Sequence, residues 1–329
     1  MLINRRQAGR LLAVGALSML ACGFAAAQSD YPNRPIRLIL GSGAGDNTDI
    51  FARVLADELG GRLRQPVIVD NKPGAAGILA GSYVAKAPPD GYTLMLGQAS
   101  TLVVAPQVVN PLPYDSTKAF TPIVKTQQGA SVLVVHRSVP ANTLAELILL
   151  AKTRPDELVL AVNALGSVQH LVMEIVQSRT GARFNTVPYK GTAPSLLAVV
   201  KGEAQIAVAG ALAAAPHIES GVLRPLAIYG ERSMPQLPNL PTMGNALNIP
   251  ELNHDFWYGV VGPAGLSKDV VAKLSTAIQA AMATPKIVEM LNKNAQFFKP
   301  NSPEEFGREM AAQWATFGKI AKDNKLEMK

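Results

Sequence analysis

The sequence predicts an α/β fold made of two α/β units followed by a helical tail. Apolar runs that suit buried strands alternate with amphipathic stretches that suit helices, and this alternation occurs twice along the chain. In the first series, residues 36–97, the order βαβαβ implies a parallel sheet with helices on both sides. A second series spans residues 132–229. Two such units are the frame of a two-lobed protein with a cleft between its lobes.

Each expected strand or helix is assigned from the spacing of its apolar residues. Residues 36–40 form an apolar run that suits a buried strand, and in residues 48–62 the apolar side chains recur on one helical face. The remaining elements of the first series are strands at 66–70 and 92–97 and a helix at 76–87. The second series gives strands at 132–135, 158–162, 204–209 and 226–229, and helices at 143–152, 167–180 and 194–201.

The last third of the chain begins with a loop and ends in helices. Residues 231–250 are rich in Pro and Asn and are expected to be a loop. A strand at 256–261 follows, and then helices at 268–283, 285–293 and 303–322. We expect residues 28–131 and 255–329 to form lobe 1 and residues 132–254 to form lobe 2.

The first 27 residues have the three-part pattern of a secretory signal peptide. Arginines 5, 6 and 10 precede a run without charge that ends in three alanines, and cleavage is expected after about Ala27. A retained anchor and lipidation of Cys22 are the alternatives, and the export route, general secretory or twin-arginine, is left open. The sequence therefore indicates an exported protein.

The composition excludes several kinds of site. Cys22 is the only cysteine and lies inside the signal, so the mature chain has neither disulfides nor thiolate metal ligands. The four histidines show no metal-ligand spacing, and neither a metal nor a cofactor is expected. The net charge of +7 includes the three signal arginines, and no basic cluster interleaved with aromatics predicts nucleic-acid binding. The absence of a G-x-S-x-G turn argues against a serine hydrolase.

The strongest local signal is a glycine-rich loop between the first strand and the first helix. Its glycines allow a tight turn, and the helix start presents unpaired N–H groups that can hold a carboxylate or phosphate. The alternatives are a plain turn capped by Asn47 or Thr48 and a dinucleotide site, although the glycines read G-x-G-x-G and not G-x-G-x-x-G. The candidate ligand contacts are Ser42, Gly43, Ala44, Gly45, Asp46, Asn47, Thr48 and Asp49.

Three further segments place polar groups at strand ends. Residues 163–167 again lie between a strand and a helix, and Ser167 can cap that helix. His170 is either a structural histidine or a ligand contact, and Lys190 is either a ligand contact or a solvated charge. The candidate contacts from these segments are Gln98, Ser100, Asn163, Leu165, Gly166, Ser167, His170, Tyr189 and Lys190.

Several short motifs, in this order and spacing, resemble the substrate-binding receptors of tripartite tricarboxylate transporters, the Bug family of Gram-negative bacteria. The resemblance covers essentially the whole mature chain. The motifs include Tyr31-Pro32, Thr48-Asp49-Ile50, Asn71-Lys72-Pro73-Gly74-Ala75, Pro89-Asp90-Gly91-Tyr92-Thr93-Leu94, Val187-Pro188-Tyr189-Lys190-Gly191 and Trp257-Tyr258-Gly259.

The resemblance implies a periplasmic protein with the type II periplasmic binding fold, without enzymatic activity. It implies a cleft in which one loop from each lobe, residues 43–49 and 163–167, holds the carboxylate of a small organic acid. The implied partners are membrane transporter subunits or, as an alternative, a membrane sensor kinase. The chain is expected to be a monomer, and an exported hydrolase is the remaining alternative.

Departures from the family pattern bear on the ligand. Asp46 stands where the family usually has glycine, and its carboxylate could repel an anion or select an amine. Ala209 and Gly210 stand where the second lobe often has Asp, and Leu165 stands where a polar residue is common. Because Ala209 occupies a position where some family members contact the ligand, it completes the set of candidate contacts. Because the cleft is more apolar than average, we expect a ligand with an aromatic or aliphatic body.

Overall fold

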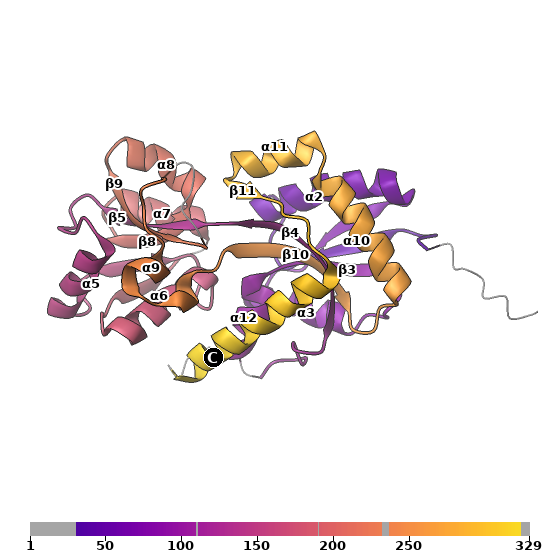
Figure 1. Cartoon of the computed structure of the whole chain (residues 1–329), viewed down its shortest axis with the longest axis horizontal. Coiled ribbons are helices and arrows are strands. Elements are labelled where there is room, and N and C mark those ends of the chain that lie inside the picture. Colours follow the sequence, from indigo (N-terminus) through magenta and orange to yellow (C-terminus); the bar gives the residue numbers. More distant parts are fainter. Residues whose placement is uncertain (1–30, 110, 190, 232–236, 324–329) are drawn as a thin grey trace, which may run out of the picture. The chain divides into compact units, whose positions relative to one another are not determined.

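The computed structural model describes residues 31–109, 111–189, 191–231 and 237–323. The predicted signal peptide and Lys190 lie outside the described residues. From Arg34 onward the described residues form one compact unit, which contains two separate β-sheets with helices packed against them (Figure 1).

The first sheet has six strands in the order β11-β4-β10-β3-β1-β2. Strand β1 pairs in parallel with both β2 and β3, as the βαβαβ pattern predicts. Strand β10 is antiparallel to β3 and to β4, so the complete sheet is mixed. The strands are β1 (Ile36–Leu40), β2 (Val67–Asn71), β3 (Thr93–Gln98), β4 (Phe120–Gly129), β10 (Phe256–Pro263) and β11 (Gln296–Phe297).

The second sheet has five strands in the order β7-β6-β8-β5-β9. Strand β6 is parallel to β7 and β8, whereas β5 is antiparallel to β8 and β9. Since β5 runs against β8, the start of β5 lies beside the carboxyl end of β8, and Ser131 pairs with Gly210. The strands are β5 (Ser131–His136), β6 (Val159–Val162), β7 (Asn185–Pro188), β8 (Ile206–Gly210) and β9 (Leu223–Tyr229).

The helices follow the predicted ones with shifts of a few residues and several additions. Those of the first part are α2 (Asn47–Leu63), η2 (Ala75–Gly77), α3 (Ile78–Ala85), the π-helical turn η3 (Ser100–Val104) and α4 (Ala105–Val108). Those around the second sheet are α5 (Leu144–Thr153), α6 (Val168–Thr180), α7 (Thr192–Val200), α8 (Ala211–Glu219), α9 (Met243–Leu247) and η4 (Pro250–Leu252). The tail contains α10 (Lys268–Met282), α11 (Pro285–Lys293) and α12 (Pro303–Asp323).

Strands β4, β7 and β11 and helix α8 are absent from the sequence prediction. Strand β4 carries Pro122, Lys125 and two glutamines, so its sequence lacks the apolar run by which buried strands are recognised. Its ten residues pair with β10 along their length, and this pairing defines the strand. The segment expected to be a loop, residues 231–250, contains the short helix α9 within its described part.

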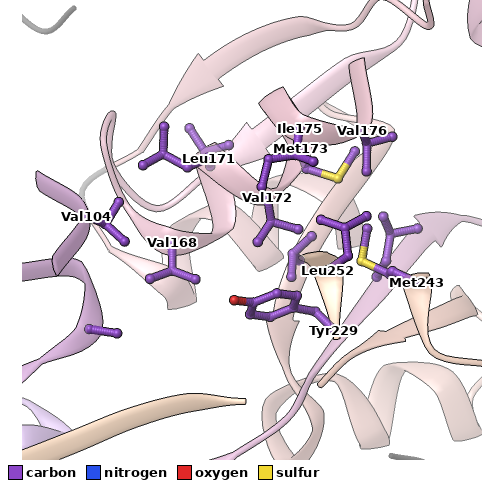
Figure 2. Packing of buried hydrophobic residues seen from close by; sticks show 14 of the residues in the cluster. Val104, Val168, Leu171, Val172, Met173, Ile175, Val176, Tyr229, Met243 and Leu252 are labelled. Atoms are coloured by element: carbon purple, nitrogen blue, oxygen red, sulfur yellow. The ribbon is translucent and has the colours of Figure 1, made fainter. Parts of the chain in front are cut away.

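Apolar packing fixes helix α6 against the second sheet. The buried side chains of α6 include Val168, Leu171, Val172, Ile175 and Val176. Figure 2 shows them beside Tyr229, Met243 and Leu252, which belong to the same buried cluster. This packing holds the first turn of α6 in place at the end of strand β6.

The start of strand β10 is held by helix α12. The Trp257 side chain is buried, its indole N–H donates to Gln313 Oε1 at 2.8 Å, and its ring meets Phe306 edge-on at 5.1 Å. Figure 1 shows α12, in yellow, crossing beside this sheet, and it contacts β4. An aromatic pair and a satisfied buried N–H give this strand a single well-defined position.

Candidate functional site

An open cavity of about 470 Å³ lies where strands of both sheets end. It is reached by the carboxyl ends of β1, β3, β6 and β8, and by the starts of the antiparallel strands β5 and β10. This is the edge of an α/β sheet at which ligands bind. The polar residues of the lining come from strand ends, loops and helix starts. They include Asn47, Gln98, Ser100, Asn163, Ser167 and Thr192.

The described residues of the cavity wall carry no formal charge. They include no Asp, Glu, Lys, Arg or His, and Tyr258 is the only titratable side chain among them. No group of three or more potential metal ligands exists among the described residues. The polarity of the described wall comes from main-chain dipoles and from neutral polar side chains.

Helix α2 begins at the cavity with two unpaired amides. Its cap is Asp46, whose Oδ1 accepts the Asp49 amide at 2.8 Å, so the expectation that Asn47 or Thr48 caps the helix is wrong. Asp46 has extended backbone angles, as an N-cap requires, and its carboxylate is engaged by the helix. Within the described structure the amides of Asn47 and Thr48 donate to no protein acceptor.

The buried carboxylate of Asp49 holds the glycine-rich loop in place through hydrogen bonds. Its side chain is only 2% exposed and accepts the Gly45 amide at 2.9 Å, two Arg53 N–H groups at 2.9 Å and the Asn71 amide group at 3.0 Å. Asn71 also donates to the Ser42 carbonyl at 3.1 Å. The Arg53 guanidinium, the Gly45 amide and Asn71 together lower the pKa of Asp49 to about 2. Asp49 thus supports the loop and does not line the cavity.

Close backbone approach adds to the rigidity of this loop. A Cβ on Gly41 would lie 2.8 Å from the Gly77 Cα, and both glycines line the cavity. Gly77 also has a positive φ of 88°, and a Cβ there would lie 2.5 Å from Thr101 Oγ1. Only glycine fits both positions, so the loop after β1 and the turn η2 pack directly on each other.

Tyr258 connects strand β10 to the start of α2. Its hydroxyl lies beside the Thr48 side chain, and both residues line a small cavity. Burial raises the pKa of the Tyr258 hydroxyl, the Thr48 side chain lowers it, and the nearby Asp46 carboxylate raises it. The hydroxyl therefore remains protonated at neutral pH and is available as a neutral hydrogen-bonding group in the wall of the cavity.

Helix α6 begins at the cavity in the same manner. Ser167 is the cap, as predicted; its Oγ accepts the His170 amide at 3.2 Å and donates to the Ala164 carbonyl at 2.8 Å. The Gly166 amide donates to His170 Nδ1 at 3.0 Å. The amides of Val168 and Gln169 have no protein acceptor in the described structure, and both residues line the cavity.

Two more helices, α7 and α8, begin at the cavity. The sequence analysis did not include their first residues among the candidate contacts. Thr192 is the first residue of α7, and Gly210 caps α8, in which Leu212 lines the cavity with half of its side chain exposed. Phe256, Trp257 and Tyr258 reach the cavity because β10 is antiparallel, so its start lies at the ligand edge. The Trp257-Tyr258-Gly259 motif was a signal that could have identified them.

The structure separates the predicted contacts into three groups. The cavity is lined by Asn47, Gln98, Ser100, Asn163, Gly166 and Ser167. Ser42 and Thr48 instead line a small adjoining cavity with Tyr258. Nine described residues lie outside both linings, and their role in ligand contact stays a prediction. They are Gly43, Ala44, Gly45, Asp46, Leu165, His170 and Tyr189, with partial or full exposure, and the buried Asp49 and Ala209. The ring of His170 accepts the Gly166 amide at Nδ1.

We predict that Asp49→Asn destabilises the protein at neutral pH by roughly 1–3 kcal/mol, because a charge-assisted network loses its carboxylate. Since the pKa of Asp49 is lowered from 3.8 to about 2 by folding, its contribution is complete above about pH 4 and is lost as the pH falls towards 2. Urea unfolding between pH 7 and pH 2.5 should therefore show the difference between wild type and variant shrinking in acid.

The control is Asp57→Asn on the same helix, which removes an exposed partner of Lys286. Exposed pairs contribute little, so its effect should stay within about 1 kcal/mol. A difference between wild type and Asp49→Asn that stays constant across this pH range would contradict the assigned role of Asp49.

Comparisons in sequence and structure give consistent matches along most of the chain. Residues 51–325 match the family described as tripartite tricarboxylate transporter family receptor. Protein BugT of Bordetella pertussis is 37% identical over 283 residues, which are 85% of this chain and 86% of BugT. No helix among the described residues is both long and apolar enough to span a membrane.

Solved structures agree with the sequence matches. The periplasmic binding protein BugD superposes with a TM-score of 0.75 and 29% identity, covering 91% of this chain and 100% of BugD. R. palustris Rpa4515 with adipate gives a TM-score of 0.77 and 32% identity, covering 90% of this chain and 99% of that chain. The two-lobed α/β fold of periplasmic binding proteins is thereby confirmed.

Proposed function

The chain belongs to the receptor family of the tripartite tricarboxylate transporters, and from that premise we propose that it captures one small carboxylic acid in the cavity. The acid is bound in the periplasm, is not altered, and is delivered to a membrane transporter of the same type. The observation that carries the proposal is the convergence of unpaired helix-start amides on an uncharged cavity. The signal peptide at residues 1–27, its cleavage and a monomeric state are parts of this proposal.

The chemistry of the walls supports a ligand with one carboxylate and an apolar body. The starts of α2 and α6 supply N–H donors and the positive ends of two helix dipoles. The rest of the wall includes Leu212, Ala213 and Phe256, which offer apolar surface. Among the described residues of the wall, a second or third carboxylate would find no cationic side chain and would lose hydration without compensation. R. palustris Rpa4515, which is similar to this chain, is a structure with adipate, a linear dicarboxylate with an aliphatic body. It supports the apolar body of the proposed ligand and not the single carboxylate.

We place the hinge between the two lobes where the chain passes between the sheets. One crossing joins β4 to β5 at Ala130, and the other leads into β10 at Asp255. Asp255 connects both crossings, because its carboxylate accepts the Glu231 amide at 3.1 Å and the Gln128 side-chain amide at 3.5 Å. The proposed lobes are residues 28–131 with 255–329, and residues 132–254. Closure about such a pair of crossings would enclose a bound acid.

Isothermal titration tests the proposed ligand class with phenylacetate, adipate and citrate as probes. We predict that phenylacetate, with one charge and an apolar body, binds at least about tenfold more tightly than citrate, which carries unmatched charges. Adipate should fall between them. Tight citrate binding together with no binding of phenylacetate would contradict the proposed ligand, and no binding of any carboxylate would contradict the proposed function.

Asn47→Pro tests the main-chain donor directly. Proline is tolerated at the first position of a helix but has no N–H, and Asp46 before it already has extended backbone angles. We predict at least an about tenfold loss of affinity for phenylacetate, because one charge-assisted hydrogen bond is removed. Asn47→Ala, which keeps the amide, should stay within about threefold of wild type.

Lys268→Pro is the remote control for the same substitution. It lies at the first position of α10 after the extended cap Ser267, away from the cavity, and should leave the affinity unchanged. Equal affinities of Asn47→Pro and Asn47→Ala for phenylacetate would exclude the Asn47 amide as a ligand donor.

A further inference from the structure

The two loops at the cavity share one local design. In each, a glycine with positive φ precedes the cap: Gly45 at 84° before Asp46, and Gly166 at 74° before Ser167. In each, the glycine amide donates to the side chain four residues later, to Asp49 at 2.9 Å and to His170 at 3.0 Å. That acceptor residue in turn donates its own amide to the cap side chain. Each acceptor residue is thus bonded twice, through its side chain to the glycine before the cap and through its amide to the cap itself.

We infer that His170 is a positioning residue that fixes the start of α6, as Asp49 fixes the start of α2. It acts through the Gly166 amide and does not contact the ligand. The inference deepens the proposed function and rests on it, because the turn that His170 closes contributes Ala164, Gly166, Ser167, Val168 and Gln169 to the cavity.

The surroundings of His170 fix both its ring orientation and its proton. Because Nδ1 accepts the Gly166 amide, the proton of the neutral ring lies on Nε2. Nε2 faces Glu174 Oε1 at 3.4 Å, and that oxygen accepts the Gln177 side-chain amide at 2.9 Å. Gln177 Oε1 accepts the Phe184 amide at 2.8 Å. The ring therefore contacts Glu174, which is held by Gln177, and these residues do not line the cavity.

Loss of the acceptor would change which amides face the cavity. Without His170 Nδ1, the Gly166 amide has no partner, and glycine allows its peptide group to turn at little steric cost. The Ala164–Ser167 turn would then sample several conformations. A ligand that binds the Val168 and Gln169 amides would have to select one of them, which weakens its apparent affinity.

The test compares His170→Asn with His170→Phe. Asn Oδ1 occupies nearly the position of Nδ1 and can accept the Gly166 amide, whereas Phe keeps the ring and removes the acceptor. We predict that His170→Phe loses about tenfold in affinity for phenylacetate and for adipate, while His170→Asn stays within about threefold of wild type. Hydrogen exchange at the Gly166 amide, measured without ligand, should be accelerated in His170→Phe and close to wild type in His170→Asn.

His136→Phe is the matched control. His136 Nδ1 also accepts a main-chain amide, that of Ser138 at 3.3 Å, but this histidine does not line the cavity. Its loss should leave affinity and Gly166 exchange unchanged. Equal loss of affinity in His170→Phe and His170→Asn would overturn the inference, as would unchanged Gly166 exchange in His170→Phe.

A spectroscopic measurement on the wild type is independent of any variant's folding. The ¹⁵N spectrum of the imidazoles should show His170 with a bare Nδ1 and a protonated Nε2, and a protonated Nδ1 in the neutral ring would overturn the inference. If neither acid binds the wild type, the proposed function fails. The exchange and tautomer measurements would still decide whether His170 holds the turn.

Discussion

The proposed site depends on one electrostatic constraint, which is that the described residues of its wall offer no cationic side chain to neutralise a bound anion. Among the described residues of the cavity wall the available positive charge is the partial charge of main-chain N–H groups at helix starts. Each such group contributes little alone, so several must point at the same place and remain there. The arrangement of strands, caps and glycines around the cavity can be understood as the means of fixing those few donors.

The helix starts are made rigid by side chains that accept hydrogen bonds from nearby main-chain amides. Those amides are then not available to a ligand. Asp49 accepts the Gly45 amide and His170 accepts the Gly166 amide. In the described structure the amides of the first two helical residues, Asn47 and Thr48 in α2 and Val168 and Gln169 in α6, have no protein acceptor. The two acceptors differ in chemical type, since one is a carboxylate and the other an imidazole nitrogen. Asp49 is anionic, and Arg53 and Asn71 neutralise it within the loop. His170 accepts through a ring nitrogen, and its other ring nitrogen faces Glu174.

The sequence allowed the fold class to be predicted because it follows from periodicity. Alternating strands and helices place loops at the carboxyl ends of parallel strands, and residues from the loops at 41–49 and 163–167 line a cavity there. That these loops bind the ligand stays a prediction. The choice of Asp46 as cap could not be predicted, since Asp46, Asn47 and Thr48 are all good caps and the backbone angles decide among them.

Other parts of the site were hidden for different physical reasons. Strand β4 is polar in sequence, and its existence depends on pairing with β10. Phe256 and Tyr258 reach the cavity through the antiparallel direction of β10, which a βαβ pattern does not reveal. The direction of the His170 ring is a rotamer property, so a histidine one turn into a helix could not be assigned to the ligand or to the loop.

A crystal structure of the protein with phenylacetate tests the central claim most directly. The account predicts that the carboxylate oxygens lie about 2.7–3.2 Å from main-chain nitrogens at the starts of α2 and α6. A carboxylate bound outside the cavity, or one inside it that contacts neither helix start, would contradict it.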